Sequence, residues 1–78
     1  MSKVTKFNCK IQFGTRLKEL RKEKSLSQET LALIAGLDRT YVSGCERGLR
    51  NIGLENIHKL AKALEIDPKS FFEKGKSE

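Results

Sequence analysis

The 78-residue sequence is poor in several residue types on which functional sites depend, with no tryptophan, one histidine, one proline, two cysteines and one tyrosine. Aromatic residues are too sparse for the stacking surfaces expected of single-stranded RNA readers. No uninterrupted apolar run approaches the length of a membrane span, and no apolar segment of a secretory signal follows the N-terminal lysines. We therefore expect a cytoplasmic protein without a membrane segment.

The scarcity of cysteine and histidine argues against metal and catalytic sites. Cys45 falls at an apolar helical position, so we expect a buried free thiol there rather than a disulfide or a ligand pair with Cys9. His58 has no neighbouring cysteine, histidine or carboxylate pattern of metal type. No pair of carboxylates, and no serine or cysteine beside a base, indicates catalysis. We expect no metal, no cofactor and no enzymatic activity.

The chain does have an excess of positive charge. The formal net charge is +6 and the pI is about 9.6, which favours a polyanionic partner. The excess lies in residues 1–24, where eight lysines and arginines stand against Glu19 and Glu23, whereas residues 25–78 are balanced. The candidate region for binding a polyanion contains all five arginines, namely Arg16, Arg21, Arg39, Arg47 and Arg50.

Residues 27–48 have the pattern of two short helices joined by a tight turn. Ser27 is a favourable N-cap for the first helix, and Asp38 is one for the second. Gly36 should end the first helix, because without a Cβ it can take the left-handed conformation that closes a helix. Apolar residues recur at helical spacing, namely Leu31, Ala32, Ile34 and Ala35 in the first helix and Tyr41, Val42 and Cys45 in the second.

Helical periodicity also marks the segments on either side of this pair. Phe13, Leu17 and Leu20 line one face of a helix predicted over residues 10–24. Asp67, followed by the single proline, is typical of the cap of a final short helix. Between them, a helix over residues 54–64 has an apolar stripe that we assign to the core, consisting of Leu54, Ile57, Leu60, Ala61 and Leu64.

The predicted architecture is therefore all-α, with five helices in one compact domain. Residues 10–74 form this domain. Residues 1–9 lack an apolar period and are expected to be a flexible N-terminal arm, and residues 75–78 are a C-terminal tail. A chain of this length buries only a small core, so its stability should depend on well-capped helices and on a partner subunit.

The whole pattern resembles the DNA-binding helix-turn-helix and, more narrowly, the lambda-repressor and Cro-like (XRE-type) family. The similarity covers about residues 11–74. The stretch LDRTYVSGCERGLRN is most similar to restriction-modification controller proteins, which typically have an aliphatic residue where Cys45 stands. An αα-hairpin of another small helical protein is the alternative. The resemblance is carried by the small Ala32, by Gly36 at the turn and by the apolar residues Leu31, Ala35, Leu37, Val42 and Cys45.

This resemblance implies a sequence-specific transcriptional regulator that binds double-stranded DNA as a homodimer on a palindromic operator. As a controller, it would regulate its own gene and the endonuclease gene. Further candidate partners are RNA polymerase and a second dimer that binds DNA cooperatively with the first. A protein-binding module such as the antitoxin of a toxin–antitoxin pair is the alternative, although only the two ends of the chain are left over to grip a toxin. The operator and the direction of regulation stay open.

In this family the second helix of the motif lies in the major groove, with its first residues at the base edges. Arg39 offers a forked donor that matches guanine, and the Thr40 methyl group can meet a thymine methyl group. Tyr41 either contacts DNA or packs on the core. The candidate base contacts are Arg39, Thr40, Tyr41, Ser43 and Gly44, the glycine allowing close approach of the helix to DNA.

Phosphate contacts are expected on and around the motif. In the family a glutamine at the start of the first motif helix holds a phosphate, and Gln28 stands there. The alternative is a plain solvent-exposed glutamine. Arg50 and Asn51 fall on the loop that crosses the DNA backbone. The candidate phosphate contacts are Arg16, on the solvent side of the first helix, Gln28, Arg47, Arg50 and Asn51.

Two further assignments concern the fold and its assembly. Relatives pair an arginine in the first helix with a glutamate near the end of the second motif helix, which implies a structural ion pair of Arg21 and Glu46. Two adjacent phenylalanines point about 100° apart on a helix, so one monomer core should not cover both fully. The alternative places both inside the monomer. The candidates for the dimer surface are Ile52, Ile66, Phe71 and Phe72.

Overall fold

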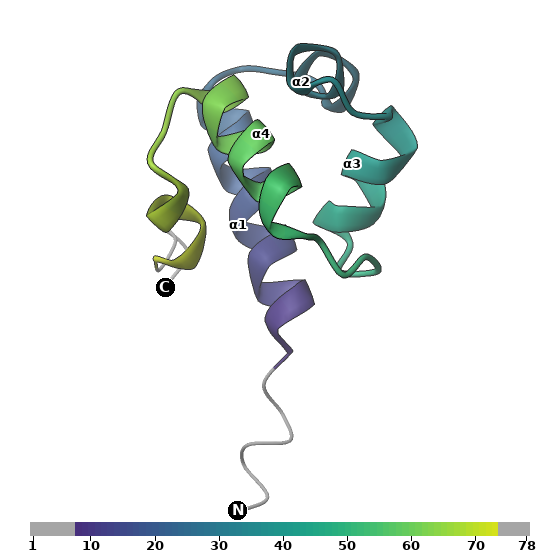
Figure 1. Cartoon of the computed structure of the whole chain (residues 1–78), viewed down its shortest axis with the longest axis vertical. Helices are drawn as coiled ribbons and strands as arrows, with labels where there is room; N and C mark the ends of the chain where they lie inside the picture. Colours follow the sequence, from purple (N-terminus) through teal and green to yellow (C-terminus); the bar gives the residue numbers. More distant parts are fainter. Residues whose placement is uncertain (1–7, 74–78) are drawn as a thin grey trace, which may run out of the picture.

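The computed structural model describes residues 8–73, and every regular element in this part of the chain is helical (Figure 1). In Figure 1, α2 lies across the top of the molecule, α3 on the right and the final short helix on the left. The predicted compact all-α architecture is confirmed. The elements are α1 (Cys9–Glu23), α2 (Gln28–Ala35), α3 (Arg39–Glu46), α4 (Leu54–Leu64) and the 3-10 helix η2 (Pro68–Phe72).

The first helix begins one residue earlier than predicted. The Asn8 side-chain oxygen accepts hydrogen bonds from the N–H groups of Lys10 and Ile11 at 3.0 and 3.2 Å, so Cys9 is the first helical residue. Asparagine is among the favoured N-cap residues, and this signal was overlooked at the boundary of the predicted arm. Asn8 and Cys9 therefore belong to the domain. The rest of the predicted arm (residues 1–7), the last residue of the predicted domain (74) and the predicted tail (75–78) lie outside the described residues.

The predicted turn between the two central helices is present. Ser27 Oγ accepts a hydrogen bond from the Thr30 N–H at 3.0 Å, and Asp38 Oδ2 accepts one from the Thr40 N–H at 2.9 Å. Gly36 ends α2 in the left-handed conformation, with a φ of 73°. Ser27 therefore sets where α2 begins, Gly36 where it ends and Asp38 where α3 begins.

A single core joins all five elements. Leu54, which the apolar stripe of α4 predicted to be in the core, is 71% exposed, so that assignment is wrong. Leu54 is the first residue of α4, so it precedes the turns of this helix that pack against the core. Each buried side chain of leucine or phenylalanine size stabilises the fold by about 1.5–3 kcal/mol. The fully buried large side chains are Leu17 of α1, Leu31 of α2, Val42 of α3, Leu60 and Leu64 of α4, and Phe71 of η2.

The backbones of α1 and α3 approach each other closely at Gly14. A Cβ atom at this position would lie 2.2 Å from the carbonyl oxygen of Cys45 and 2.7 Å from that of Glu46. Both oxygens belong to the backbone, so no side-chain rotation could relieve the clash. The absence of a side chain at Gly14 therefore sets how closely the second motif helix packs on the first helix of the domain.

The final predicted helix is a 3-10 helix, and the predicted count of five α-helices is not confirmed. The Ser70 N–H donates to the carbonyl oxygen of Asp67, three residues earlier, at 2.9 Å. Bonds of this spacing define a 3-10 helix, which is common in short segments such as this five-residue one. The predicted cap is present, since the Asp67 carboxylate accepts from the Lys69 N–H at 2.9 Å.

Candidate nucleic-acid interface

One face of α3 is exposed, and it contains side chains predicted to contact DNA. Arg39, Ser43 and Arg47 are spaced four residues apart, which places them along one face of the helix and its C-terminal cap. Arg39, Thr40 and Arg47 are exposed, and Ser43 is half-buried. The other face turns the buried residues Val42, Cys45 and Glu46 toward the protein. The domain therefore presents α3 with its basic side outward.

The cap of α3 also engages Thr40. Hydrogen bonds from the Thr40 side chain and then from its backbone N–H hold the pKa of Asp38 below its ordinary value of 3.8. Asp38 is therefore ionised at neutral pH, and the cap is fully formed. Because the Thr40 hydroxyl group is hydrogen-bonded to Asp38, the Thr40 methyl group remains available for an apolar contact. The contact of this methyl group with a thymine stays a prediction.

Tyr41 packs against the core and bonds to α4. Its ring is half-buried, and its hydroxyl oxygen accepts a hydrogen bond from Asn56 Nδ2 at 3.0 Å. The alternative in which Tyr41 packs on the core therefore describes the structure, and a DNA contact of its hydroxyl group stays a prediction. The sequence pattern missed Asn56. Its signal is a polar residue four positions before the buried Leu60, on the inward side of α4.

Gly44 is covered by the side chain of Arg50. A Cβ atom on Gly44 would lie 3.0 Å from Arg50 Cγ and 3.1 Å from Arg50 Nε. The guanidinium carbon of Arg50 lies 5.4 Å from the centre of the Tyr41 ring. Arg50 therefore folds back along α3 and fills the space that the glycine leaves. Gly44 is buried beneath this side chain, whereas Arg50 and Asn51 are exposed, and the close approach of the helix to DNA at Gly44 stays a prediction.

Arg16 is directed into the protein, so the prediction that it lies on the solvent side of α1 is wrong, and its internal hydrogen bonds argue against the predicted phosphate contact. Its side chain is only 13% exposed. Nε donates to the Ser70 carbonyl oxygen at 2.8 Å, and Nη1 donates to Glu19 Oε1 at 3.2 Å. Arg16 follows Phe13 by three residues and so borders the inward face of α1. Its role is to link α1 to η2.

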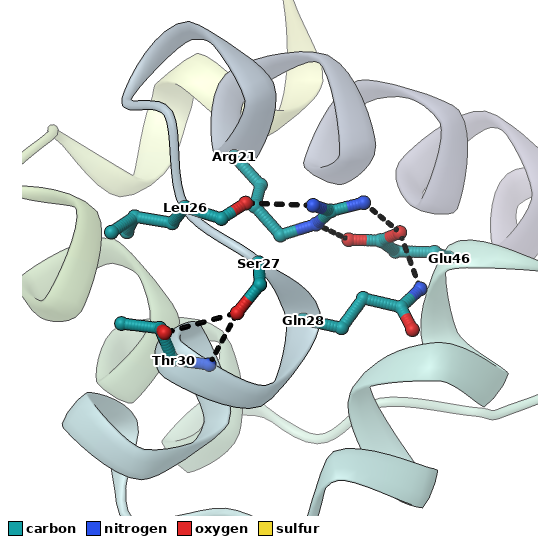
Figure 2. Close-up of polar contacts among 6 residues, drawn as sticks. All are labelled: Arg21, Leu26, Ser27, Gln28, Thr30 and Glu46. Carbon is teal, nitrogen blue, oxygen red and sulfur yellow. Dashed lines mark hydrogen bonds and ion pairs between the residues drawn. The ribbon is translucent and has the colours of Figure 1, made fainter.

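A buried ion pair joins α1 to α3 (Figure 2). Arg21 Nε donates to Glu46 Oε2 at 2.6 Å, and Nη2 donates to Glu46 Oε1 at 3.0 Å. The two side chains are 10% and 2% exposed. Arg21 Nη1 also donates to the Leu26 carbonyl oxygen at 2.7 Å, just before α2. The pair that the resemblance implied is therefore present, and Arg21 is directed inward.

Gln28 extends this network to the start of α2. Its Nε2 atom donates a hydrogen bond to Glu46 Oε1 at 2.9 Å. The residue is half-buried and follows directly after the Ser27 cap (Figure 2). Gln28 is therefore not the plain solvent-exposed glutamine of the alternative interpretation. Its contact with a phosphate stays a prediction.

The two adjacent phenylalanines have different environments. Phe71 is 1% exposed, and its ring centre lies 4.9 Å from that of Phe13, so its assignment to a dimer surface is wrong. Phe72 is 69% exposed, so the expectation that one core does not cover both is met. Ile52 and Ile66 are half-buried and pack against the core. Other exposed large apolar side chains are Ile11, Leu33, Ile34, Leu49 and Leu54.

Both cysteines are free, with Cys9 exposed and Cys45 buried as predicted. Burial raises the pKa of the Cys45 thiol, which keeps it protonated at neutral pH. Within residues 8–73, no cluster of three or more histidine, cysteine or acidic side chains could hold a metal ion. No helix in that same range combines the length and the apolar character needed to cross a membrane.

Comparison with known proteins gives relatives that match most of the chain. Control protein C.BamHI from Bacillus amyloliquefaciens is 45% identical over 67 residues, which cover 85% of this chain and 83% of that protein. Control protein C.MunI from Mycoplasma sp is 48% identical over 66 residues, which cover 83% of this chain and 89% of that protein. Both matches span nearly the whole described domain.

A solved structure and a family profile agree with these relatives. The crystal structure of the restriction-modification controller protein C.AhdI from Aeromonas hydrophila has a TM-score of 0.79 and 61% sequence identity, covering 80% of this chain and 94% of that one. The profile of the helix-turn-helix family matches residues 17–71. The resemblance predicted from the turn and its apolar positions is confirmed, and the chain belongs to the helix-turn-helix family, with restriction-modification controller proteins among its relatives.

Proposed function

We propose that the chain binds a two-fold symmetric operator as a homodimer and, as a restriction-modification controller, regulates its own gene and the endonuclease gene. Its family makes it a DNA-binding regulator of transcription. Relatives named as control proteins support the more specific role. The observation that carries the proposal is the exposed face of α3, where Arg39, Thr40 and Arg47 lie outward on a helix fixed to the core.

In this proposal α3 enters the major groove with its first turn at the base edges. Arg39 would donate to guanine, with Thr40 and Ser43 as neighbouring contacts. The phosphate contacts would come from Gln28, Arg47, Arg50 and Asn51, which lie on or beside the same pair of helices. Because the arginines displace counterions from DNA, the affinity should fall steeply as the salt concentration rises.

A homodimer supports this mode of binding, because two-fold symmetry can place two α3 helices in successive major grooves about 10 bp apart. Phe72 is an exposed aromatic residue available for its interface, and Ile52 and Ile66 are further candidates. We expect Phe72→Glu to reduce the mass in solution from dimer to monomer. Leu33→Glu, at an exposed leucine on α2, is the control and should leave the mass unchanged.

The test of the proposed function is selection of bound sequences from a random duplex library, combined with the mass of the complex by light scattering. We expect a two-fold symmetric consensus bound by a dimer, or by two dimers. Regulation of the two genes would then require this consensus upstream of them. A protein that enriches no consensus and loses its affinity at moderate salt would contradict the proposal, because its charge would then act without sequence specificity.

A further inference from the structure

The Glu46 carboxylate accepts hydrogen bonds from residues of two other helices. Two of its hydrogen bonds come from Arg21 on α1, and the third comes from the Gln28 side chain on α2. The Glu46 side chain is only 2% exposed. The Arg21 bonds account for the stability of a buried carboxylate, whereas the Gln28 bond joins it to a half-buried residue at the edge of the network.

The chemistry of this contact fixes the orientation of the Gln28 amide. A carboxylate only accepts hydrogen bonds, so the amide must turn its nitrogen, rather than its oxygen, toward Glu46. Figure 2 shows the Gln28 oxygen on the side away from Glu46. The same nitrogen has a second N–H, whose direction is fixed once the first N–H is bonded.

The ion pair also removes an electrostatic conflict. A lone carboxylate close to Gln28 would repel a phosphate. The bidentate contact with Arg21, at 2.6 and 3.0 Å, offsets the charge of Glu46. Glu46 can therefore hold the Gln28 amide without making its surroundings strongly negative.

We infer that Glu46 is a positioning residue for DNA binding, which, held by Arg21, orients the Gln28 amide for its contact with a DNA phosphate. The inference rests on the proposed function, because that contact is part of it. An amide that is already immobilised loses less conformational entropy on binding than a free side chain does. The ion pair of the fold thus also prepares a contact with the DNA backbone.

A double-mutant cycle tests this inference. Glu46→Gln, Gln28→Ala and the double variant are compared by their affinity for a duplex that the wild-type chain selects from the random library, well below their unfolding temperatures. We expect each single change to weaken binding, and the two sites to be coupled by about threefold or more. Glu46→Gln should therefore have much less effect when Gln28 is already alanine. Losses that simply multiply would overturn the inference, because Glu46 would then act independently of Gln28.

The change of charge in Glu46→Gln is controlled within the cycle, because the same change is measured in the Gln28→Ala background. Gln12→Ala is the matched control for loss of a glutamine, since Gln12 is exposed on α1 and should leave the affinity unchanged. If the wild-type chain selected no duplex at all, the proposed function would fail together with the inference. If the wild-type chain selects a duplex but the two sites are not coupled, the inference fails and the proposed function stands.

A measurement on the wild-type chain decides the matter where Glu46→Gln does not fold. The side-chain amide of Gln28 should be rigid without DNA, whereas that of Gln12 should have an NMR order parameter below about 0.6. Addition of the selected duplex should shift the Gln28 amide resonances. A Gln28 amide as mobile as that of Gln12, or one that the duplex leaves unshifted, would overturn the inference.

Discussion

Arg21 and Arg39 have the same side chain and the same charge, yet the protein encloses one and exposes the other. Arg21 is directed at Glu46 and at the Leu26 carbonyl oxygen, and only 10% of its side chain is exposed. Arg39 lies on the outer face of α3. The difference shows that acceptors inside the fold, rather than the charge itself, decide which arginines remain for a polyanion. Arg16 was mispredicted because its acceptor at Ser70 is remote in sequence.

Removing the enclosed arginine should have the largest effect. Arg21→Ala would leave the Glu46 carboxylate buried without its charged partner, which typically costs about 3–5 kcal/mol. We expect the variant to be mostly unfolded already without denaturant, as measured by chemical denaturation. Arg47→Ala, which removes an exposed arginine, should stay within about 0.5 kcal/mol of the wild type. Equal stabilities of the two variants would erase the distinction between enclosed and exposed arginines.

The close contact of α1 with α3 allows a buried glycine, Gly14, to be compared with an exposed one, Gly53. Gly14→Ala should destabilise the fold by about 1–3 kcal/mol, because its methyl group would meet backbone oxygens of α3. Gly53→Ala is the control for the added methyl group, since a Cβ atom there would have no heavy atom within 4 Å apart from Gly53 itself and its chain neighbours. Thermal unfolding of both variants measures the difference. A Gly14→Ala protein as stable as Gly53→Ala would mean that α3 does not rest on α1 as closely as described.

Arg16→Ala should affect stability alone, which would distinguish Arg16 from the exposed arginines. Loss of the bonds to Ser70 and Glu19 should cost about 1–2 kcal/mol. Its affinity for DNA should match that of the wild type at temperatures where both are folded. Arg50→Ala should show the opposite pattern, with weaker binding to selected and random duplexes alike and little loss of stability. Weakened DNA binding by folded Arg16→Ala would restore its phosphate role.

The smallest effect concerns the cap of α3 and its dependence on pH. The pKa of Asp38 is lowered in the folded protein, so the ionised cap stabilises α3 above the ordinary value of 3.8 and is lost as the pH falls through the lower folded value. Amide hydrogen exchange in the first turn of α3 should therefore quicken, relative to its intrinsic rate, as the pH falls below 3.8. Asp38→Asn should remove this dependence while keeping a capping side chain. An identical pH profile in both proteins would exclude the titration of Asp38 as its cause.

Local signals in the sequence were sufficient for most of the fold. Ser27, Asp38 and Asp67 cap the helices that they were predicted to cap, and Gly36 makes the predicted turn. Each of these features depends on hydrogen bonds or dihedral angles within a few residues. Asn8 had the same kind of signal and was overlooked. The pairing of Arg21 with Glu46 came from the resemblance to relatives, since no local rule joins residues that are 25 positions apart.

Contacts between distant segments could not be predicted in this way. Arg16 meets Ser70 across 54 positions, and Tyr41 meets Asn56 across 15. The pattern could show that one core would not cover both adjacent phenylalanines, but not that Phe71 would be the buried one. These outcomes depend on how whole helices pack. The outward face of α3 could be predicted from the sequence. Of the side-chain hydrogen bonds that join α3 to the other helices, only those between Arg21 and Glu46 were predicted.

Whether α3 reads bases is tested most directly by the affinity of Arg39→Ala for a selected duplex and for a scrambled duplex of the same composition. We expect a loss of about 1–3 kcal/mol on the selected duplex. On the scrambled duplex the loss should be small, so the preference for the selected sequence falls. Equal losses on both duplexes would contradict base reading by Arg39 and would place it with the phosphate contacts.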